Sequence, residues 1–295
     1  MTRIAIVTDS TADLPAQLAR ERSLTVVPLS VTVGGRGFLD GVEIDASSFY
    51  DRMRASGGAT TSQPSPGQFA EAYQRLLDNH DAVLSIHISQ RLSGTFGSAR
   101  QGAALADEHR ITVLDSGTVS MQLALLVLLA RRMADEGATV AEIAKQLREA
   151  AGRGRLLFTV ATLEHLRRGG RIGKAAALVG SVLQVKPLLT IADGVVTPLE
   201  KVRTYDRAVA RVGELARKLD AGRGLCLIVG HAATEETAMR LAGDLEDIAE
   251  TLLVHQIGPV VGAHAGPGTV GLGCYPAEIC PLGLGVSSLA AAASS

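Results

Sequence analysis

The first 150 residues alternate short apolar runs with longer segments of mixed apolar and polar positions. The apolar runs at 3–8, 82–88 and 111–114 have the length of buried strands. The longer segments predict helices over 15–22, 67–77, 93–105, 119–135 and 139–150. Strands that alternate with helices are typical of a parallel sheet with helices on both faces. The sequence therefore predicts an N-terminal parallel-sheet α/β domain over residues 1–152.

A segment of different character, at about 25–58, interrupts this alternation. Residues 25–33 and 36–39 are rich in β-forming side chains, and the pair Gly34-Gly35 lies between them, which predicts a hairpin. A short helix over 47–55 is expected to end at the next glycine pair. We interpret 25–58 as an insertion that contains a hairpin.

The pattern changes after the Gly- and Arg-rich stretch 151–155. Strands are predicted over 156–160, 187–191, 195–202, 225–229 and 251–256, helices over 205–219 and 234–247, and a helical turn over 258–263. The dipeptide Asp193-Gly194 between two of these strands is a strong hairpin signal. A mixed-sheet α/β domain over 153–285 is therefore predicted, and the Ala/Ser-rich residues 286–295 are expected to form a flexible tail.

Composition narrows the classes of function. Hydrophobic residues make up 46% of the 295 residues, which is enough for two cores. A formal net charge of -1 and an aromatic content of 3% without Trp argue against capture of nucleic acid by charge or by base stacking. The longest uncharged apolar run, 116–130, is shorter than the roughly 18 residues that a membrane-spanning helix needs, so it predicts a buried helix.

The three cysteines are Cys226, Cys274 and Cys280. Their odd number, with no secretory signal at 1–4, fits a reducing cytoplasm, so a cytoplasmic protein is expected. Cys274, Cys280 and His264 make a poor metal site, because the five-residue spacing is loose and prolines intervene. No metal is therefore expected.

Hydroxyl residues and glycines occur together in two segments of the N-terminal half. Thr61 and Ser62 precede Pro64 and Pro66, which favour an extended backbone from which a hydroxyl can donate to an anion. The segment Ser93-Gly94-Thr95 follows a predicted strand and begins a predicted helix. Ser93 is thus a candidate N-cap, and the N–H groups of Gly94 and Thr95 could hold a carboxylate or phosphate. Taken alone, each segment has a simpler structural explanation. Thr61 and Ser62 can be an ordinary flank before a helix, and Ser93 can be an ordinary helix cap.

The glycine-rich motifs of the second half are weak evidence for a ligand-binding or nucleotide-binding site. His264 lies in the Gly- and Pro-rich run 258–268 and can donate an N–H to a carboxylate, although a lone histidine is more often structural. Residues 266–271 match G-x-G-x-x-G without the strand, helix and acidic residue of a dinucleotide site. Residues 169–175 imitate a phosphate loop with the wrong glycine spacing and with Ala175 in place of the metal-binding hydroxyl. The chain also lacks the G-x-S-x-G elbow of many serine hydrolases.

Taken together, these segments resemble the DegV family. The resemblance covers residues 3–281 in the order of the family. It rests on 8–15 (TDSTADLP), 61–65 (TSQPS), 93–95 (SGT), 168–173 (RGGRIG), 186–189 (KPLL) and the run 258–268. Each motif is short, but six in the same order are specific.

This resemblance implies a two-domain protein that buries a long-chain fatty acid, of the palmitate or oleate class, between its domains, with a role in lipid transport or fatty acid metabolism. By position, Thr61 and Ser93 match the hydroxyls that hold the carboxylate, and His264 matches the histidine beside it. Some members present the acid to a separate fatty-acid kinase, which brings ATP and Mg²⁺ and makes an acyl phosphate. Arg171 matches an arginine implicated in docking to that kinase.

We therefore expect a carrier protein rather than an enzyme, with the fatty acid as its ligand and no cofactor of its own. Two alternatives stay open. One is a serine-dependent acyl hydrolase or transferase with Ser93 as nucleophile and His264 as base. The other is a lipid-sensing regulator. The sequence does not indicate which residues line the tunnel.

Overall fold

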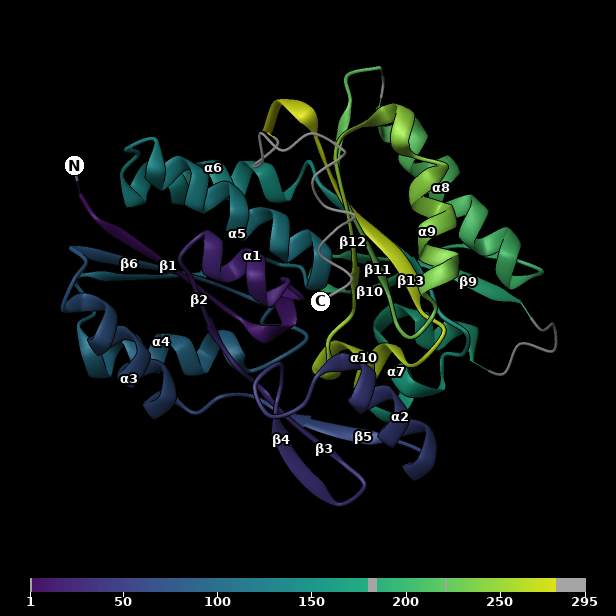
Figure 1. Ribbon diagram of the computed structural model, residues 1–295, viewed down its shortest axis with the longest axis horizontal. Helices are drawn as coiled ribbons and strands as arrows, with labels where there is room; N and C mark the ends of the chain where they lie inside the picture. The colour runs from purple at the N-terminus through teal and green to yellow at the C-terminus, as the bar shows by residue number, and fades with distance from the viewer. Residues whose placement is uncertain (1, 180–184, 221, 280–295) are drawn as a thin grey trace.

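A computed structural model describes residues 2–179, 185–220 and 222–279. Two β-sheets, one in each half of the chain, form the frame of the molecule, and a small third sheet lies beside them (Figure 1). The predicted α/β class, with a parallel sheet followed by a mixed sheet, is confirmed. The proposed domain boundary at 152/153 falls between a helix and the first strand of the second sheet.

The N-terminal sheet has four parallel strands in the order β2-β1-β6-β7. They are β1 (Ile4–Asp9), β2 (Leu24–Val27), β6 (Ala82–His87) and β7 (Ile111–Asp115). Every residue of β1 is buried, as expected of a central parallel strand covered on both faces. The helices α3 (Pro66–Leu77) and α4 (Thr95–Ala106) pack together against this sheet (Figure 1).

The predicted insertion differs from the expectation in two respects. Its hairpin consists of β3 (Ser30–Val33) and β4 (Arg36–Leu39), and a third strand, β5 (Ala59–Ser62), pairs with β3. The predicted strand 25–33 is divided, because β2 belongs to the parallel sheet and Pro28, which has no N–H to donate, follows it. The helix α2 (Ala46–Ser56) lies between β4 and β5. Thr61 is therefore fixed on a strand.

The second sheet has six strands in the order β10-β9-β8-β13-β11-β12. They are β8 (Arg155–Thr159), β9 (Lys186–Ala192), β10 (Val195–Val202), β11 (Leu225–His231), β12 (Ala249–Gln256) and β13 (Val270–Pro276). The β11–β12 pair is parallel and the other pairs are antiparallel. Asp193 and Gly194 form the predicted two-residue turn, with φ angles of 52° and 74°. The sequence did not predict β13, which lies inside the sheet.

One helix joins the two halves. α5 (Ser120–Asp135) lies between the sheets, against β1 on one side and β13 on the other, and its residues 120–130 are buried. A helix that is apolar on all sides is expected in such a place. α6 (Val140–Ala151) packs on α5, while α8 (Tyr205–Asp220) and α9 (Glu235–Gly243) cover the outer face of the second sheet (Figure 1).

The remaining elements are short. They are the 3-10 turns η1 (Ser10–Ala12), η2 (Gly173–Leu178), η3 (Glu246–Ile248) and η4 (Ala277–Ile279), and the helices α1 (Ala16–Glu21), α7 (Glu164–Arg168) and α10 (Pro259–Ala265). The predicted turn at 258–263 is α10, and the predicted helix 234–247 ends early, at α9, before η3. No helix among the described residues is both long and apolar enough to cross a membrane. The predicted tail 286–295 lies outside these residues, as does Cys280.

Candidate functional site

A cavity lies between the two halves and takes its lining from both. The N-terminal half contributes Thr11, Leu29, Thr61, Ile88, Leu92, Ser93, Val119, Ser120 and Met121. The C-terminal half contributes Leu156, Phe158, Leu166, Arg171, Ile191, Val196, Ile257, Val260, Val261, His264, Ala265 and Thr269. Most of these side chains are apolar, so the cavity suits a hydrocarbon.

The helix α10 gives the cavity its direction. Ile257, Val260, Val261 and His264 all line it, in a row along this helix and the residue before its cap. At 1.5 Å per residue, Ile257 and His264 lie roughly 10 Å apart along the axis. His264 thus marks a polar end of the cavity, and Ile257, Val260 and Val261 form an apolar wall that leads away from it.

Three of the predicted carboxylate-binding residues line this cavity, and two of them are in contact at its polar end. Thr61 Oγ1 and His264 Nε2 lie 2.8 Å apart, although the two residues are 203 positions apart in the chain. Arg171 Nε donates to the backbone oxygen of Leu92, the neighbour of Ser93, at 3.0 Å. Thr61, Ser93, His264 and Arg171 all line the same cavity.

His264 is held in its neutral form. Burial, and after it the positive charge of Arg171, lowers the pKa of His264 to about 4. Its Nδ1 atom is buried without a hydrogen-bond partner among the described residues. That side of the ring packs against Gly169, where a Cβ atom would overlap Nδ1. Nε2 is therefore the ring nitrogen that faces the polar end.

Ser93 is not the N-cap of α4, contrary to the prediction. Gly94 is the cap residue, and its carbonyl oxygen accepts the first helical hydrogen bond, from Ser98 N at 3.0 Å. Ser93 Oγ instead accepts from Thr95 N at 3.3 Å and shares a 2.8 Å hydrogen bond with Thr95 Oγ1. Because Thr95 is fully buried, it supports Ser93 from behind.

Ser62, Gly94 and Thr95 lie outside the lining of the cavity, contrary to the expectation that they contact the ligand. Ser62 and Gly94 are exposed. The Gln63 side chain fills the space over Gly94 where a Cβ would lie, and its Nε2 donates to Ser98 Oγ at 2.9 Å. Gly94 thus admits Gln63 rather than a ligand, and Gln63 ties the Thr61 strand to α4.

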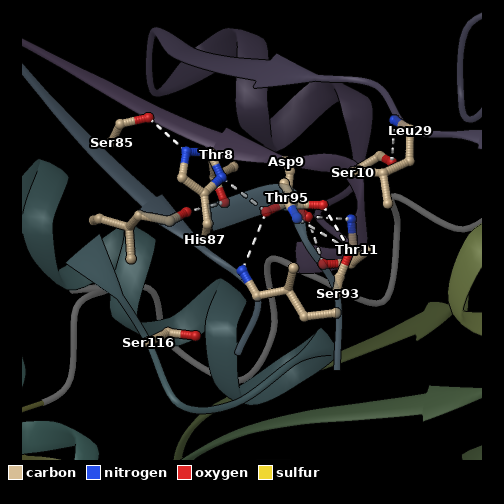
Figure 2. A network of polar contacts seen from close by, with 12 residues as sticks. Thr8, Asp9, Ser10, Thr11, Leu29, Ser85, His87, Ser93, Thr95 and Ser116 are labelled. Carbon is tan, nitrogen blue, oxygen red and sulfur yellow. Dashed lines mark hydrogen bonds and ion pairs between the residues drawn. The ribbon is translucent and has the colours of Figure 1, made fainter. Parts of the chain in front are cut away.

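A fully buried polar network supports the wall of the cavity (Figure 2). Asp9 Oδ2 accepts from Ile88 N at 3.1 Å and pairs with His87 Nδ1 at 2.8 Å. His87 Nε2 in turn contacts Ser85 Oγ at 2.7 Å. Asp9 Oδ1 accepts from the Thr11 hydroxyl at 2.5 Å, and Thr11 lines the cavity. The Ser85–His87–Asp9 chain is inaccessible, so we assign it the role of fixing the ends of β1 and β6.

Side chains of the N-terminal half also hold the start of α10. Gly258 N donates to Asp13 Oδ1 at 2.9 Å, and Tyr50 OH donates to the carbonyl oxygen of Ile257 at 2.9 Å. Burial raises the pKa of Asp13 well above its usual value, although hydrogen bonds from Ser120 and Gly258 oppose the shift. No local motif indicates these contacts, because they join segments more than 200 residues apart.

Asp40 is the second buried carboxyl group beside α10. Burial raises its pKa to about 7, and the charge of Asp9 adds to the shift. Hydrogen bonds from the Ser10 hydroxyl and the Val260 backbone N–H act in the opposite direction. Asp40 Oδ2 is buried and has no hydrogen-bond partner among the described residues.

Arg167, Arg168, Arg171 and Lys174 form a basic cluster, and most of its members pair with acidic side chains of the same chain. Arg167 and Arg168 pair with Glu164 at 2.7 and 2.9 Å, and Lys174 pairs with Asp193 at 3.0 Å. Arg171 is exposed and forms no ion pair with any described residue. The same described part of the chain holds no group of three or more His, Cys, Asp and Glu side chains that could bind a metal.

The polar end of the cavity reaches the surface. Thr61, Arg171 and His264 also line a surface hollow, together with His165 and Arg168. This hollow lies between the β3–β5 sheet and α7, next to α10. A group held at the polar end is therefore close to a surface that another protein could approach.

Comparison with known proteins identifies the family of this chain. The family model described as "Uncharacterised protein, DegV family" matches residues 3–277. The chain belongs to the DegV family. A DegV domain-containing protein of Streptomyces coelicolor is 41% identical over 273 residues, which are 91% of this chain and 97% of that protein. The resemblance seen in the sequence motifs is thus confirmed.

Solved structures of DegV family proteins share the whole fold. A DegV family protein of Thermus thermophilus, described by its fatty acid binding, has a TM-score of 0.87 and 35% identity, covering 93% of this chain and 99% of that one. DegV of Bacillus subtilis, described as a fatty acid binding protein, has a TM-score of 0.86 and 33% identity, covering 93% and 100%.

Proposed function

We propose that this DegV family protein binds one long-chain fatty acid, of the palmitate or oleate class, in the cavity between its two sheets. The tail lies along α10 toward Ile257, and the carboxylate lies at Thr61, Ser93 and His264. The observation that carries the proposal is a largely apolar cavity lined by all three groups, with Thr61 and His264 in contact. The fatty acid binding of the relatives from Thermus thermophilus and Bacillus subtilis supports it.

The tail supplies most of the affinity. About 14 methylenes at about 0.8 kcal/mol each give roughly 11 kcal/mol before the costs of binding. Each hydrogen bond to a charged group adds about 1.5–3 kcal/mol. The polar end therefore selects an acid over an ester or alcohol, while the tail holds the ligand.

Neutral His264 sets the direction of the hydrogen bonds at the polar end. With the proton on Nε2, His264 donates to Thr61 Oγ1, and the Thr61 hydroxyl is free to donate to the carboxylate. Ser93 can donate to the second carboxylate oxygen while it accepts from Thr95 N. Arg171 also lines the cavity, but its guanidinium donates to the backbone oxygens of Leu92 and Gly169, so we assign it to docking and not to the carboxylate.

In this proposal the protein presents the carboxyl group of its ligand to a separate fatty-acid kinase. The kinase holds ATP and Mg²⁺ and makes the acyl phosphate. The protein thereby serves lipid transport or fatty acid metabolism. The hollow that shares Thr61, Arg171 and His264 with the cavity gives the partner access to the acid. Arg171, exposed and without an ion pair among the described residues, is the proposed docking residue.

The geometry disfavours the serine hydrolase alternative. A nucleophile and its base must share a hydrogen bond. Here Nε2 of His264 contacts Thr61, Nδ1 packs against Gly169, and Ser93 Oγ bonds to Thr95. An activated acyl ester should therefore leave Ser93 unlabelled; covalent labelling that Ser93→Ala abolishes would revive the hydrolase.

Binding of oleate by calorimetry tests the proposed polar end. Thr61→Val and Ser93→Ala should each weaken oleate binding about tenfold or more, because each removes one hydrogen bond to a charge. Thr60→Val is the matched control, since Thr60 is the exposed neighbour on the same strand. Methyl oleate should bind the wild type and the three variants alike. Equal oleate affinity in all four proteins would refute the assigned carboxylate site.

The docking role of Arg171 needs a second assay. Arg171→Ala should retain oleate within a few-fold and weaken acyl phosphate formation by the kinase, because the guanidinium lies at the surface. Arg167→Ala, which removes a neighbouring charge already paired with Glu164, is the control. Loss of oleate from Arg171→Ala would show instead that Arg171 mainly holds the carboxylate.

A further inference from the structure

We infer that the hydroxyls of Ser120 and Thr11 form a second polar position in the cavity, and that the protein binds long-chain acids that carry a hydroxyl group in the middle of the tail. Both residues line the cavity, and their exposed fractions are only 3% and 1%. This inference rests on the proposed function and names a class of ligand within it.

A carboxyl group lies behind each of the two hydroxyls. Ser120 Oγ hydrogen-bonds to Asp13 Oδ2. Thr11 Oγ1 donates to Asp9 Oδ1 at 2.5 Å (Figure 2). A hydroxyl has one hydrogen and two lone pairs, so a single bond to a carboxyl group leaves at least one lone pair that can accept from a ligand. Met121 Sδ, 2.8 Å from Ser120 Oγ, is only a weak hydrogen-bond partner.

The same carboxyl groups make this position unsuitable for the charged head of the ligand. Burial raises the pKa of Asp13 well above its usual value, and the charges of Asp40 and Asp9 add to the shift. A ligand carboxylate beside Ser120 would bring a further negative charge to this group. A neutral hydroxyl brings no charge and can donate a hydrogen bond. The position therefore suits an alcohol and not an acid.

Asp13 places Ser120 at a distance from the proposed carboxylate site. Its Oδ1 accepts from Gly258 N at 2.9 Å while its Oδ2 bonds to Ser120, so Ser120 lies near the start of α10. From Gly258 to His264, α10 advances by roughly 9 Å. An extended 18-carbon acid is roughly 20 Å long, because each bond of about 1.5 Å belongs to a zigzag. The second polar position thus meets the middle of the tail. Thr11 belongs to η1, which packs on α5.

The backbone of Ser120 supports a role for its side chain. Its φ angle is 57°, in the left-handed region that glycine adopts without steric cost. Residues strained in this way are concentrated at functional sites. A hydroxyl that is needed in the cavity accounts for a serine at this position.

The test compares stearate with stearates hydroxylated at carbon 8, 10 or 12, by calorimetry. The wild type should bind at least one hydroxystearate as tightly as stearate. Ser120→Ala and Thr11→Val should each weaken that hydroxystearate about tenfold relative to stearate, because a buried hydroxyl loses a partner. Thr11→Ser, which keeps the hydroxyl, should keep the wild-type ratio. Ser10→Ala is the matched control, since Ser10 lies on the same turn and bonds to the buried Asp40 but does not line the cavity.

The outcomes separate this inference from the proposed function. A wild type that binds stearate but binds every hydroxystearate at least tenfold more weakly would overturn the second polar position. So would a wild-type ratio in both Ser120→Ala and Thr11→Val. Should Ser120→Ala fail to fold, Ser120→Gly, which suits the left-handed backbone, gives the same comparison. A wild type that binds neither stearate nor its derivatives would refute the proposed function itself.

Discussion

Asp40→Asn should remove a large part of the pH dependence of folding. Asp40 is only 5% exposed, and its pKa is raised from 3.8 to about 7, chiefly by burial. The unfolded chain ionises this group near pH 4, whereas the folded protein keeps the proton until about pH 7. The contribution of Asp40 to stability should therefore be fully present below about pH 4 and be lost as the pH rises to about 7. Three units at 1.36 kcal/mol each amount to about 4 kcal/mol.

An asparagine cannot ionise, so the variant lacks this contribution to the slope. It should match the wild type within about 1 kcal/mol near pH 4.5 and exceed it by up to about 4 kcal/mol at pH 8.

Urea unfolding of the wild type and the variant at half-unit steps from pH 4.5 to 8 measures the difference directly. Asp51→Asn, at a side chain 75% exposed, is the control and should run parallel to the wild type. Parallel curves for Asp40→Asn as well would mean that Asp40 ionises normally in the folded protein, and the reasoning from its burial would fail.

Two further substitutions test the support of α10 and of its histidine. Gly169→Ala should weaken oleate binding several-fold with little change in the binding of methyl oleate, because the new Cβ displaces His264 from Thr61; calorimetry with both ligands checks this. Tyr50→Phe should lower the free energy of unfolding by about 1 kcal/mol, because it removes the hydrogen bond to Ile257 O; urea unfolding checks this.

Local patterns were sufficient to predict most of the frame. The apolar run of β1 is a central strand, the uncharged run 116–130 is the buried helix α5, and Asp193-Gly194 turns a hairpin. Each of these signals lies within a few neighbouring residues. Local patterns did not predict strand β13, because its glycines Gly271 and Gly273 are typical of a loop. They are required by packing, since a Cβ at either position would overlap Phe158 or the backbone of α5.

The sequence predicts only those residues of the candidate site that belong to a recognisable short motif. Thr61, Ser93 and His264 were named from short motifs, and the structure places all three in one cavity. Ser62, Gly94 and Thr95 were named for the same reason but lie outside its lining, because side-chain direction is set by the strand and by Gln63. The apolar lining and the contacts of Asp13, Asp40 and Tyr50 with α10 join distant segments, so no local pattern indicates them.

Mass spectrometry of the protein under native conditions, followed by extraction of its lipid, tests fatty acid binding most directly. We expect one long-chain fatty acid per chain, displaced by added oleate and retained far less well by the Thr61→Val, Ser93→Ala double variant. A protein that carries no lipid and takes up neither palmitate nor oleate would contradict the central claim.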